Sequence, residues 1–154
     1  MISPEHALEG VYEHKMDTKC RVSVPADWRV TAGNGYLRLL QSSSYELKVL
    51  RVLTEDEYLN MLQEVENRED ISYATKRKVL GRLHSQILKT TLSTQGKLLI
   101  PKAWCETPGL SPEESIVLVG RGAYFEILSP KNYEEMLVRE EAETSALNDE
   151  LGFF

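Results

Sequence analysis

The sequence predicts an α+β protein, rich in β-strands, in which two pseudo-symmetric halves form one small barrel with flanking helices. Two observations support this prediction. One pattern of residues occurs twice at a nearly constant offset, and each occurrence combines short apolar strands with short helices. The 154 residues are 42% hydrophobic and 27% charged, an ordinary globular composition in a chain long enough to bury a core.

The repeat is clearest around the two tryptophans. Residues 16–28 read MDTKCRVSVPADW, and residues 92–104 read LSTQGKLLIPKAW, with an offset of 76 throughout. The pattern T-x-x-x-Y-x-x-M-L begins at Thr54 and returns, with serine in place of threonine, at Ser129, an offset of 75. Two matches in the same order and at nearly one spacing indicate a duplication.

The first repeated segment predicts a turn, a short strand and one helical turn. We expect the turns and strands at 17–20 and 21–24 in the first half, and at 93–96 and 97–100 in the second. Pro25 and Pro101 end these strands, because proline cannot donate to a strand ladder. Each proline also suits the first position of the helical turn that follows.

The rest of each half predicts a β-hairpin followed by a helix. The expected strands are 36–41 and 45–52, joined by Ser42–Ser44, and 115–120 and 123–128, joined by Gly120–Gly122. Thr54 and Ser129 are suited to cap the helices that follow. Glu57 completes a capping box with Thr54.

One predicted helix, capped by Ser72, has no counterpart in the other half. Residues 72–87 place Tyr73, Leu80, Leu83 and Ile87 on one helix face, so this helix connects the two halves. A half of about 75 residues has too small a core and open strand edges. We therefore expect the halves to pair about a pseudo-twofold axis and to close the barrel.

Charge is distributed unevenly along the chain. The net charge is −6, and residues 134–154 alone carry seven acidic residues and one basic residue. Residues 71–105 carry seven basic residues and no acidic one. Such a patch attracts phosphate locally, because salt screens a distant acidic tail within about 8–10 Å. A solvated helix face is the ordinary alternative interpretation.

No residues are spaced for catalysis or for binding a metal. The three histidines and two cysteines show no metal-ligand spacing, namely His6, His14, His84, Cys20 and Cys105. The glycines are isolated and form no phosphate-binding loop. We therefore expect no enzyme activity, cofactor, metal or small-molecule substrate. The lack of a long apolar run or a secretory signal, with only two cysteines, favours a cytoplasmic protein without a membrane partner.

The segment from Tyr12 to Pro25, YEHKMDTKCRVSVP, resembles the MraZ family of bacterial transcriptional regulators, which are built from two SpoVT-AbrB-type repeats. The family pattern is a Tyr-Glu-His stretch, then Asp-x-Lys-Gly-Arg and a short strand that ends in proline. It recurs in the second half as Asp-x-x-Gly-Arg before Ile-Pro, which residues 92–101 follow loosely. The resemblance extends from about Gly10 to Leu137.

The resemblance implies two swapped-hairpin halves in one barrel. The expected divisions are a first repeat at 10–56, a helical connector at 57–88, a second repeat at 89–132, and a C-terminal helix with an acidic tail at 133–154. The resemblance also implies a ring-like homo-oligomer that binds double-stranded DNA at repeated promoter boxes. These boxes would lie upstream of the cell-division and cell-wall gene cluster, so the protein is expected on the nucleoid.

In the family, the turn before the short strand reads the DNA. The matched positions are Asp17 and Arg21 in the first half and Ser93 and Lys97 in the second. Arginine offers a planar fork that can grip phosphate or the edge of guanine in two places, and the aspartate can hold that fork in one orientation. Lys15 and Lys19 would add charge for phosphate. The alternative is a surface ion pair worth about 0–1 kcal/mol that stabilises a hairpin.

The chain departs from the family pattern at three positions. Cys20 replaces a glycine, which adds strain or changes the turn if the site needs a positive φ. Ser93 removes the orienting carboxylate, and Lys97 keeps a charge without the fork. We therefore expect the second turn to hold phosphate without reading bases. Substitution of Arg21 should weaken specific binding more than substitution of Lys97.

Three further questions stay open at this point. On the same fold, the altered second turn and the acidic charge are also typical of a protein-binding oligomeric scaffold that has lost specific DNA binding. The acidic end at 140–154 is either a helix with a frayed tail or a shield for the basic helix or another subunit, in which case its deletion strengthens DNA binding at low salt. Trp28 and Trp104 could stack on bases, but their matched positions favour paired core residues.

Overall fold

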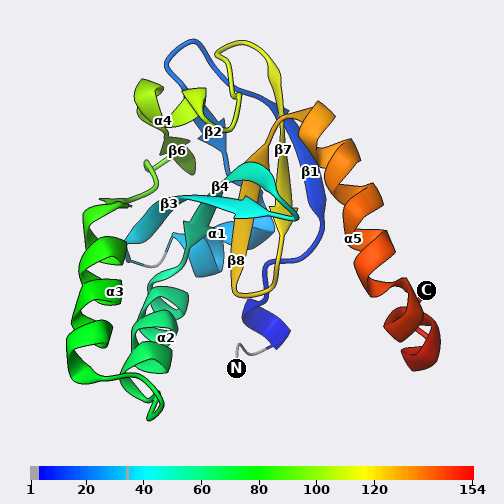
Figure 1. Cartoon of the computed structure of the whole chain (residues 1–154). Helices are drawn as coiled ribbons and strands as arrows, with labels where there is room; N and C mark the ends of the chain where they lie inside the picture. The colour runs from blue at the N-terminus through cyan, green and yellow to red at the C-terminus, as the bar shows by residue number, and fades with distance from the viewer. Residues whose placement is uncertain (1–3, 34) are drawn as a thin grey trace.

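An antiparallel six-stranded sheet organises the chain (Figure 1). The structure is a computed structural model that describes residues 4–33 and 35–154. Residues 1–3, which belong to the segment that shows no secretory signal in the sequence, lie outside the described residues. The strand order is β1-β7-β8-β4-β3-β5, with bounds β1 Val11–Lys15, β3 Leu37–Ser44, β4 Leu47–Leu53, β5 Ile87–Thr90, β7 Ser115–Gly120 and β8 Tyr124–Leu128. A separate two-stranded ladder pairs β2 (Arg21–Ser23) with β6 (Lys97–Leu99).

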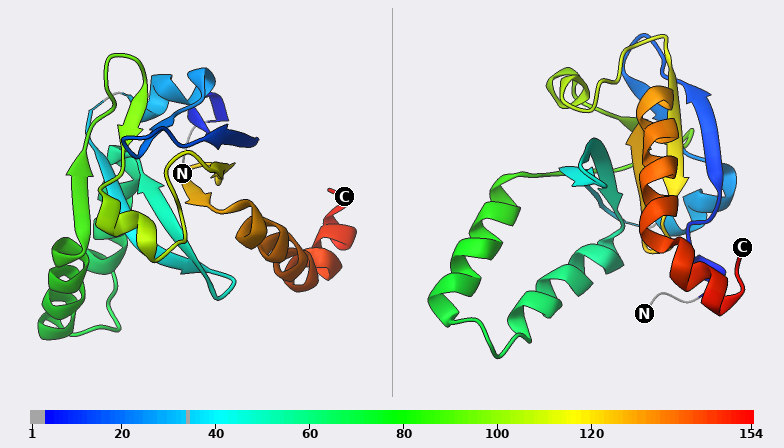
Figure 2. Two further views of the ribbon diagram at one scale, coloured as in Figure 1. Left: turned by 90° about the horizontal axis from the view of Figure 1, so that it is seen from above. Right: turned by 45° about the vertical axis from the view of Figure 1, so that its right-hand side comes forward.

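The helices lie around these two sheets. They are the 3-10 turn η1 Pro4–His6 and the α-helices α1 Ala26–Ala32, α2 Glu55–Glu66, α3 Tyr73–Ser85, α4 Lys102–Glu106 and α5 Pro130–Leu151. Helices α2 and α3 form a hairpin that projects on one side of the molecule, and α5 lies on the opposite side (Figures 1 and 2). The acidic α5 therefore does not cover the basic α3 within one chain.

The α+β class and the strand-rich content are confirmed, but the large sheet is open and the predicted closed barrel is wrong. Among the described residues β1 pairs only with β7, and β5 pairs only with β3, so each leaves a free edge. The strands that could have extended these edges, β2 and β6, pair with each other instead. The strand order nevertheless reads the same from both edges when β1 is exchanged with β5, β3 with β7, and β4 with β8.

The first hairpin turns later than the sequence predicts. Ser42, Ser43 and Ser44 belong to β3, where they pair with β4. The turn consists of Tyr45 and Glu46, whose φ angles are 52° and 67°. Two successive residues with positive φ are typical of the tight turns whose twist matches that of paired strands. The serines can therefore stay in the ladder rather than in the loop.

The connecting helix is shorter than predicted. Helix α3 ends at Ser85, and Ile87 begins β5, where it pairs with Leu40. No residue of α3 is buried, so a further helical turn would add little packing, whereas strand pairing satisfies the backbone of this segment. Strands β1 and β5 were not among those predicted from the sequence. Both are short edge strands whose pairing partners lie far away in the sequence.

The predicted helix starts are confirmed. The hydroxyl oxygens of Thr54, Ser72 and Ser129 each accept a hydrogen bond from the backbone N–H three residues further on, at 3.2 Å. For Thr54 this is the backbone half of the predicted capping box. Pro25 and Pro101 differ slightly from expectation, because each is the residue before its helix rather than the first helical residue.

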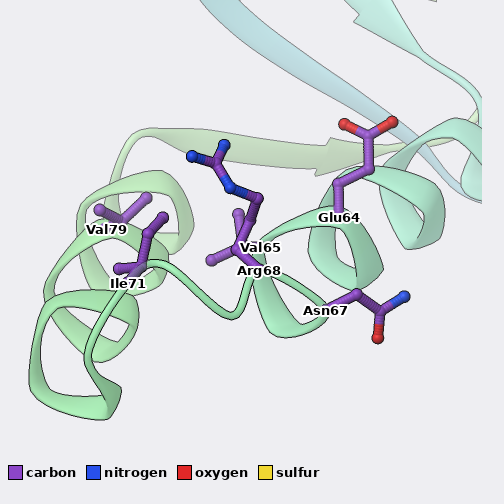
Figure 3. Close-up of a pocket in the computed structure, with 6 residues that line it drawn as sticks. All are labelled: Glu64, Val65, Asn67, Arg68, Ile71 and Val79. Atoms are coloured by element: carbon purple, nitrogen blue, oxygen red, sulfur yellow. The ribbon is translucent and has the colours of Figure 1, made fainter.

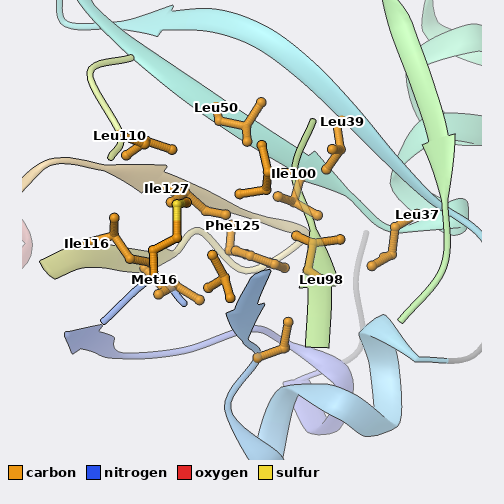
Figure 4. Packing of buried hydrophobic residues seen from close by; sticks show 14 of the residues in the cluster. Met16, Leu37, Leu39, Leu50, Leu98, Ile100, Leu110, Ile116, Phe125 and Ile127 are labelled. Carbon is orange, nitrogen blue, oxygen red and sulfur yellow. The ribbon is translucent and has the colours of Figure 1, made fainter. Parts of the chain in front are cut away.

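The main core lies between the large sheet and the β2–β6 ladder. Leu98 and Ile100 from the β6 segment pack among Leu50, Phe125 and Ile127 of the sheet (Figure 4). Both halves therefore contribute to one core, and neither has a complete core of its own.

The two tryptophans differ in burial. Trp28 is only 1% exposed, lies 5.2 Å from the ring of Tyr12 in a T-shaped arrangement, and donates its Nε1–H to the carbonyl oxygen of Glu9 at 2.9 Å. Trp104 is half-buried at the margin of the same core. The prediction of paired core residues is thus confirmed for Trp28 and holds only partly for Trp104.

The described residues contain neither a membrane-spanning helix nor a cluster of metal ligands. None of the helices in 4–33 and 35–154 is long and apolar enough to cross a membrane. Within the same part of the chain, no three His, Cys, Asp or Glu side chains gather as a metal site would require.

Candidate nucleic-acid interface

The β2–β6 ladder separates core residues from the predicted site residues. Alternate residues of a strand point to opposite faces. Val22 and Leu98 are fully buried against the core. The other face therefore carries Arg21 and Ser23 from β2 and Lys97 and Leu99 from β6. In the register Arg21 lies opposite Leu99, and Ser23 lies opposite Lys97, so both predicted cations share one face outside the core.

The first turn is built around the carboxylate of Asp17. Its Oδ1 accepts hydrogen bonds from the backbone N–H of Lys19 at 2.9 Å and of Arg21 at 2.8 Å. Its Oδ2 accepts a hydrogen bond from the Nε–H of Arg21 at 2.8 Å. One oxygen thus shapes the turn, and the other holds the guanidinium.

The environment of Asp17 favours its charged form. The backbone hydrogen bond from Arg21 is the main reason why the pKa of this carboxyl lies below its ordinary value of 3.8, and the Arg21 side chain and the Lys19 backbone add to the effect. Arg21 keeps 38% of its side chain exposed. Among the described residues, its two Nη groups have no hydrogen-bond partner, so they are available to a ligand.

Cys20 occupies the position where the family pattern has glycine, and the turn keeps its shape. The φ of Cys20 is 61°, in the left-handed region that glycine favours. Its N–H donates to the carbonyl oxygen of Asp17 at 3.1 Å, and its own carbonyl accepts from Ile100 at 3.0 Å. The Cys20 side chain is buried beside Cys105, and burial is the main reason why the pKa of the Cys105 thiol rises to about 11.

The second turn has the same backbone with fewer side-chain interactions. Ser93 Oγ accepts from the backbone N–H of Gln95 at 3.3 Å and of Lys97 at 3.1 Å. Gly96 stands at the position of Cys20, with a φ of 75°. Because serine has one oxygen, nothing corresponds to the second carboxylate oxygen of Asp17. The Lys97 ammonium instead donates to Ser23 Oγ across the ladder at 3.2 Å.

The structure brings the predicted site residues together in two groups. Asp17, Lys19 and Arg21 share the first turn, and Lys15 lies exposed at the end of β1, just before it. Ser93 and Lys97 share the second turn. Because β2 and β6 are antiparallel, the turns that precede them lie at opposite ends of the ladder.

The basic segment of the sequence is divided among three places. Lys97 and Lys102 lie in or beside the ladder, and Lys89 lies in the edge strand β5. The other four basic residues belong to α3 on the projecting hairpin (Figure 1), namely Lys76, Arg77, Lys78 and Arg82. The hairpin has a hollow of its own, lined by Glu64, Val65, Asn67, Arg68, Ile71 and Val79 (Figure 3). None of the predicted site residues lines this hollow.

One functional candidate was missed in the sequence. Arg29 of α1 donates its Nε–H to the carbonyl oxygen of Val24 at 2.8 Å, and its guanidinium lies against the backbone of Gly96. The offset of 76 that matches the two tryptophans also matches Arg29 to Cys105 and Cys20 to Gly96. In each pair a small residue in one half matches a larger one in the other half, and this difference between the halves is the signal in the sequence that points to Arg29.

The fold and the ladder define a class of protein: a β-rich α+β chain whose matched turns present cations on one face of a two-stranded ladder. No protein-family model matches the chain. The chain is 25% identical to the transcriptional regulator MraZ of Treponema denticola over 145 residues, which are 94% of this chain and 97% of that protein.

Two further relatives carry the same name. The transcriptional regulator MraZ of Rickettsia canadensis is 25% identical over 130 residues, 82% of this chain and 83% of that protein. That of an Anaeromyxobacter species (strain Fw109-5) is 25% identical over 132 residues, 85% and 89% of the two chains. The resemblance of this chain to the MraZ family, as a divergent relative, is thereby confirmed. These relatives are named as regulators rather than as enzymes.

Proposed function

We propose that this protein is a sequence-specific DNA-binding regulator of transcription and that the turn at 17–20 is its main contact with DNA. The observation that carries the proposal is the clamped guanidinium of Arg21. Asp17 holds its Nε at 2.8 Å, and its Nη groups remain open on the face away from the core. An arginine held in one orientation can bond two acceptors of guanine in the major groove, which is the commonest specific contact of this kind.

The other predicted residues supply position and charge. Lys15 and Lys19 are exposed on either side of Asp17 and would bind phosphate, which fixes the register of a protein on DNA without reading its sequence. Ser93 and Lys97 would hold phosphate at the second turn. The tie of Lys97 to Ser23 supports this weaker role, because part of its hydrogen-bonding capacity is already used.

The finer parts of the proposal concern assembly and target. The chain would consist of two SpoVT-AbrB-type repeats at 10–56 and 89–132, with a connector at 57–88 and a C-terminal helix and tail at 133–154. Copies of it would form a ring on repeated boxes upstream of the cell-division and cell-wall genes, on the nucleoid. The strand order, which is symmetric under exchange of the halves, supports two repeats. A ring would multiply weak single contacts into firm binding.

A gel shift with DNA from immediately upstream of the protein's own gene tests the proposal. Arg21→Ala should weaken specific binding about tenfold to a hundredfold, since a bidentate base contact contributes about 1–3 kcal/mol of discrimination. Lys97→Ala should have a smaller effect. Arg68→Ala removes an arginine from the hairpin, far from the ladder in the fold, and should bind like the wild type. Equal losses for Arg21→Ala and Lys97→Ala would reject the asymmetry between the turns.

A protein-binding scaffold on the same fold is the second candidate. The net charge of −6 and the loss of the carboxylate and the guanidinium from the second turn favour it. A salt titration separates the two candidates. Binding to DNA releases counterions, so the logarithm of the affinity should fall linearly with the logarithm of the salt concentration. A scaffold would bind no DNA even at low salt.

A further inference from the structure

Arg29 lies directly across the second turn. A Cβ atom on residue 96 would overlap the Nε and Cζ atoms of Arg29, so the guanidinium can reach this place only because residue 96 is glycine. The Arg29 Nε–H donates to the carbonyl oxygen of Val24 at 2.8 Å, and the Val24 N–H donates to the Gly96 carbonyl at 3.0 Å. Helix α1 therefore holds this side chain against the turn between β5 and β6. Figure 2 (left) shows the ribbon of α1 beside that turn.

The corresponding place at the first turn is filled differently. There Cys20 stands where the second turn has Gly96, and the short, buried side chain of Cys105 stands where the second turn has Arg29. The Cβ of Cys20 fits because the residue facing it is small. The two turns thus carry complementary pairs: a cysteine facing a cysteine at one, and a glycine facing an arginine at the other.

As a result each turn has one arginine with the same state of hydrogen bonding. Arg21 and Arg29 both have their Nε–H engaged, with Asp17 and with Val24 respectively. Neither has a partner for its Nη groups among the described residues. Arg29 is exposed, and within that part of the chain it forms no ion pair.

We propose that Arg29 is a DNA-phosphate contact that supplies the second turn with the guanidinium that Lys97 lacks. This inference rests on the proposed function of the ladder. The chemistry of the two anchors separates their roles. Asp17 neutralises Arg21, which suits the reading of base edges. The neutral carbonyl of Val24 leaves the full positive charge on Arg29, which suits an anionic phosphate.

The position of Arg29 fits this role. The two turns lie at opposite ends of the antiparallel ladder, so Arg21 and Arg29 mark its two ends. A duplex that lies along the ladder would meet a base-reading arginine at one end and a phosphate-binding arginine at the other. The second turn would then contribute to affinity without contributing to sequence preference.

Fluorescence anisotropy with two labelled duplexes tests this role. One duplex comes from upstream of the protein's gene and the other is its scrambled sequence, and each is titrated at several salt concentrations. Arg29→Gln should weaken binding to both duplexes by the same factor of about ten and should reduce the slope of log affinity against log salt by about one for each second turn engaged. Arg21→Gln should instead reduce the preference for the upstream duplex. Arg68→Gln is the matched control and should change neither quantity.

A second variant tests the contact with Gly96. Gly96→Ala should displace Arg29 and weaken binding as Arg29→Gln does, and the double variant should be no weaker than either single one. Thermal melting of each variant shows whether it is folded. If Gly96→Ala does not fold, Arg29→Lys, which keeps the charge, should retain most of the affinity that Arg29→Gln loses.

The outcomes distinguish this inference from the proposed function. If Arg29→Gln binds each duplex with the affinity of the wild type while Arg21→Gln loses the preference for the upstream duplex, the role of Arg29 is overturned and the function of the ladder stands. If the wild type binds neither duplex at low salt, the proposed function fails, and the role of Arg29 fails with it.

Discussion

At the scale of single residues, the two turns show what one additional oxygen atom does. Asp17 and Ser93 both accept hydrogen bonds from the backbone N–H groups two and four residues further on. One oxygen is therefore enough to shape the turn. The second oxygen of Asp17 holds the Arg21 side chain and has no counterpart at Ser93. The shape of the turn and the orientation of its cation are thus separate properties of one residue.

Asp17→Ser should separate these properties in an experiment. The serine oxygen can keep the turn, so the melting temperature should change little, whereas Arg21 loses its clamp and specific DNA affinity should fall about tenfold. Anisotropy and thermal melting measure the two effects. A large drop in melting temperature would show that the second oxygen is also needed for folding.

The titration of Asp17 provides a second test at this scale. Its pKa is lowered in the folded protein, so its contribution to stability is complete above the ordinary value of 3.8 and is lost as the pH falls through the lowered pKa. Because the main cause is the backbone N–H of Arg21, Arg21→Ala should return the pKa only partly towards 3.8. A carboxyl titration followed by NMR measures this. A full return would mean that the side chain is the main cause.

At the scale of elements, a buried ionic cluster attaches α5 to the sheet. Glu126 of β8 is 0% exposed and accepts from Arg121 Nε at 2.9 Å, with Arg51 Nη2 at 3.4 Å and the Ser44 hydroxyl also in contact. Arg121 also donates to Glu140 of α5 at 2.5 Å. On this side of the sheet Met136 of α5 packs in a second buried cluster with residues of β4, β7 and β8. The acidic end of the chain is therefore partly structural, because Glu140 belongs to this cluster.

Arg121→Met should destabilise the fold strongly. Removing Arg121 leaves the buried Glu126 with only the longer ionic contact to Arg51 at 3.4 Å, and breaking a buried ion pair costs up to about 3–5 kcal/mol. Urea denaturation should show this as a lower midpoint with an unchanged slope. Arg68→Met breaks the exposed pair with Asp70 and should shift the midpoint much less, because solvent screens an exposed ion pair. Similar losses for both variants would contradict a structural role of the cluster.

At the scale of the whole molecule, the two halves are interlocked. Strand β1 of the first half pairs with β7 of the second, β2 pairs with β6, and β4 pairs with β8. The ladder that carries the candidate interface therefore exists only when both halves are present. The proposed binding of DNA at this ladder therefore requires the whole chain to fold.

Separated halves should not fold on their own. A fragment of residues 1–70 would leave Val22 and the inner face of β4 uncovered, so it should give the circular dichroism spectrum of a largely unfolded chain. Mixing it with a fragment of residues 71–154 should restore the spectrum of the intact protein. A cooperative thermal transition for the first fragment alone would contradict the interlocked core.

The sequence by itself determined the features that depend on neighbours in the chain. The caps at Thr54, Ser72 and Ser129 and the turns before β2 and β6 could be predicted, because each rests on contacts within a few residues. The short apolar runs that end in proline predict the strands β2 and β6, but not that these strands pair with each other. The clamp between Asp17 and Arg21 belongs to the same class, since it joins residues only four apart. Cys20 shows the limit, because the sequence alone did not reveal whether a cysteine could replace the glycine.

The tertiary structure decided what depends on partners far apart in the chain. The edge strands β1 and β5 form only by pairing with β7 and β3, and the pairing of β2 with β6 leaves the sheet open rather than closed into a barrel. The same holds for the site. Arg29 and Gly96 lie 67 positions apart, and only the pairing of the two halves lays that guanidinium across the second turn. Long-range pairing, rather than local preference, sets which side chains share the candidate interface.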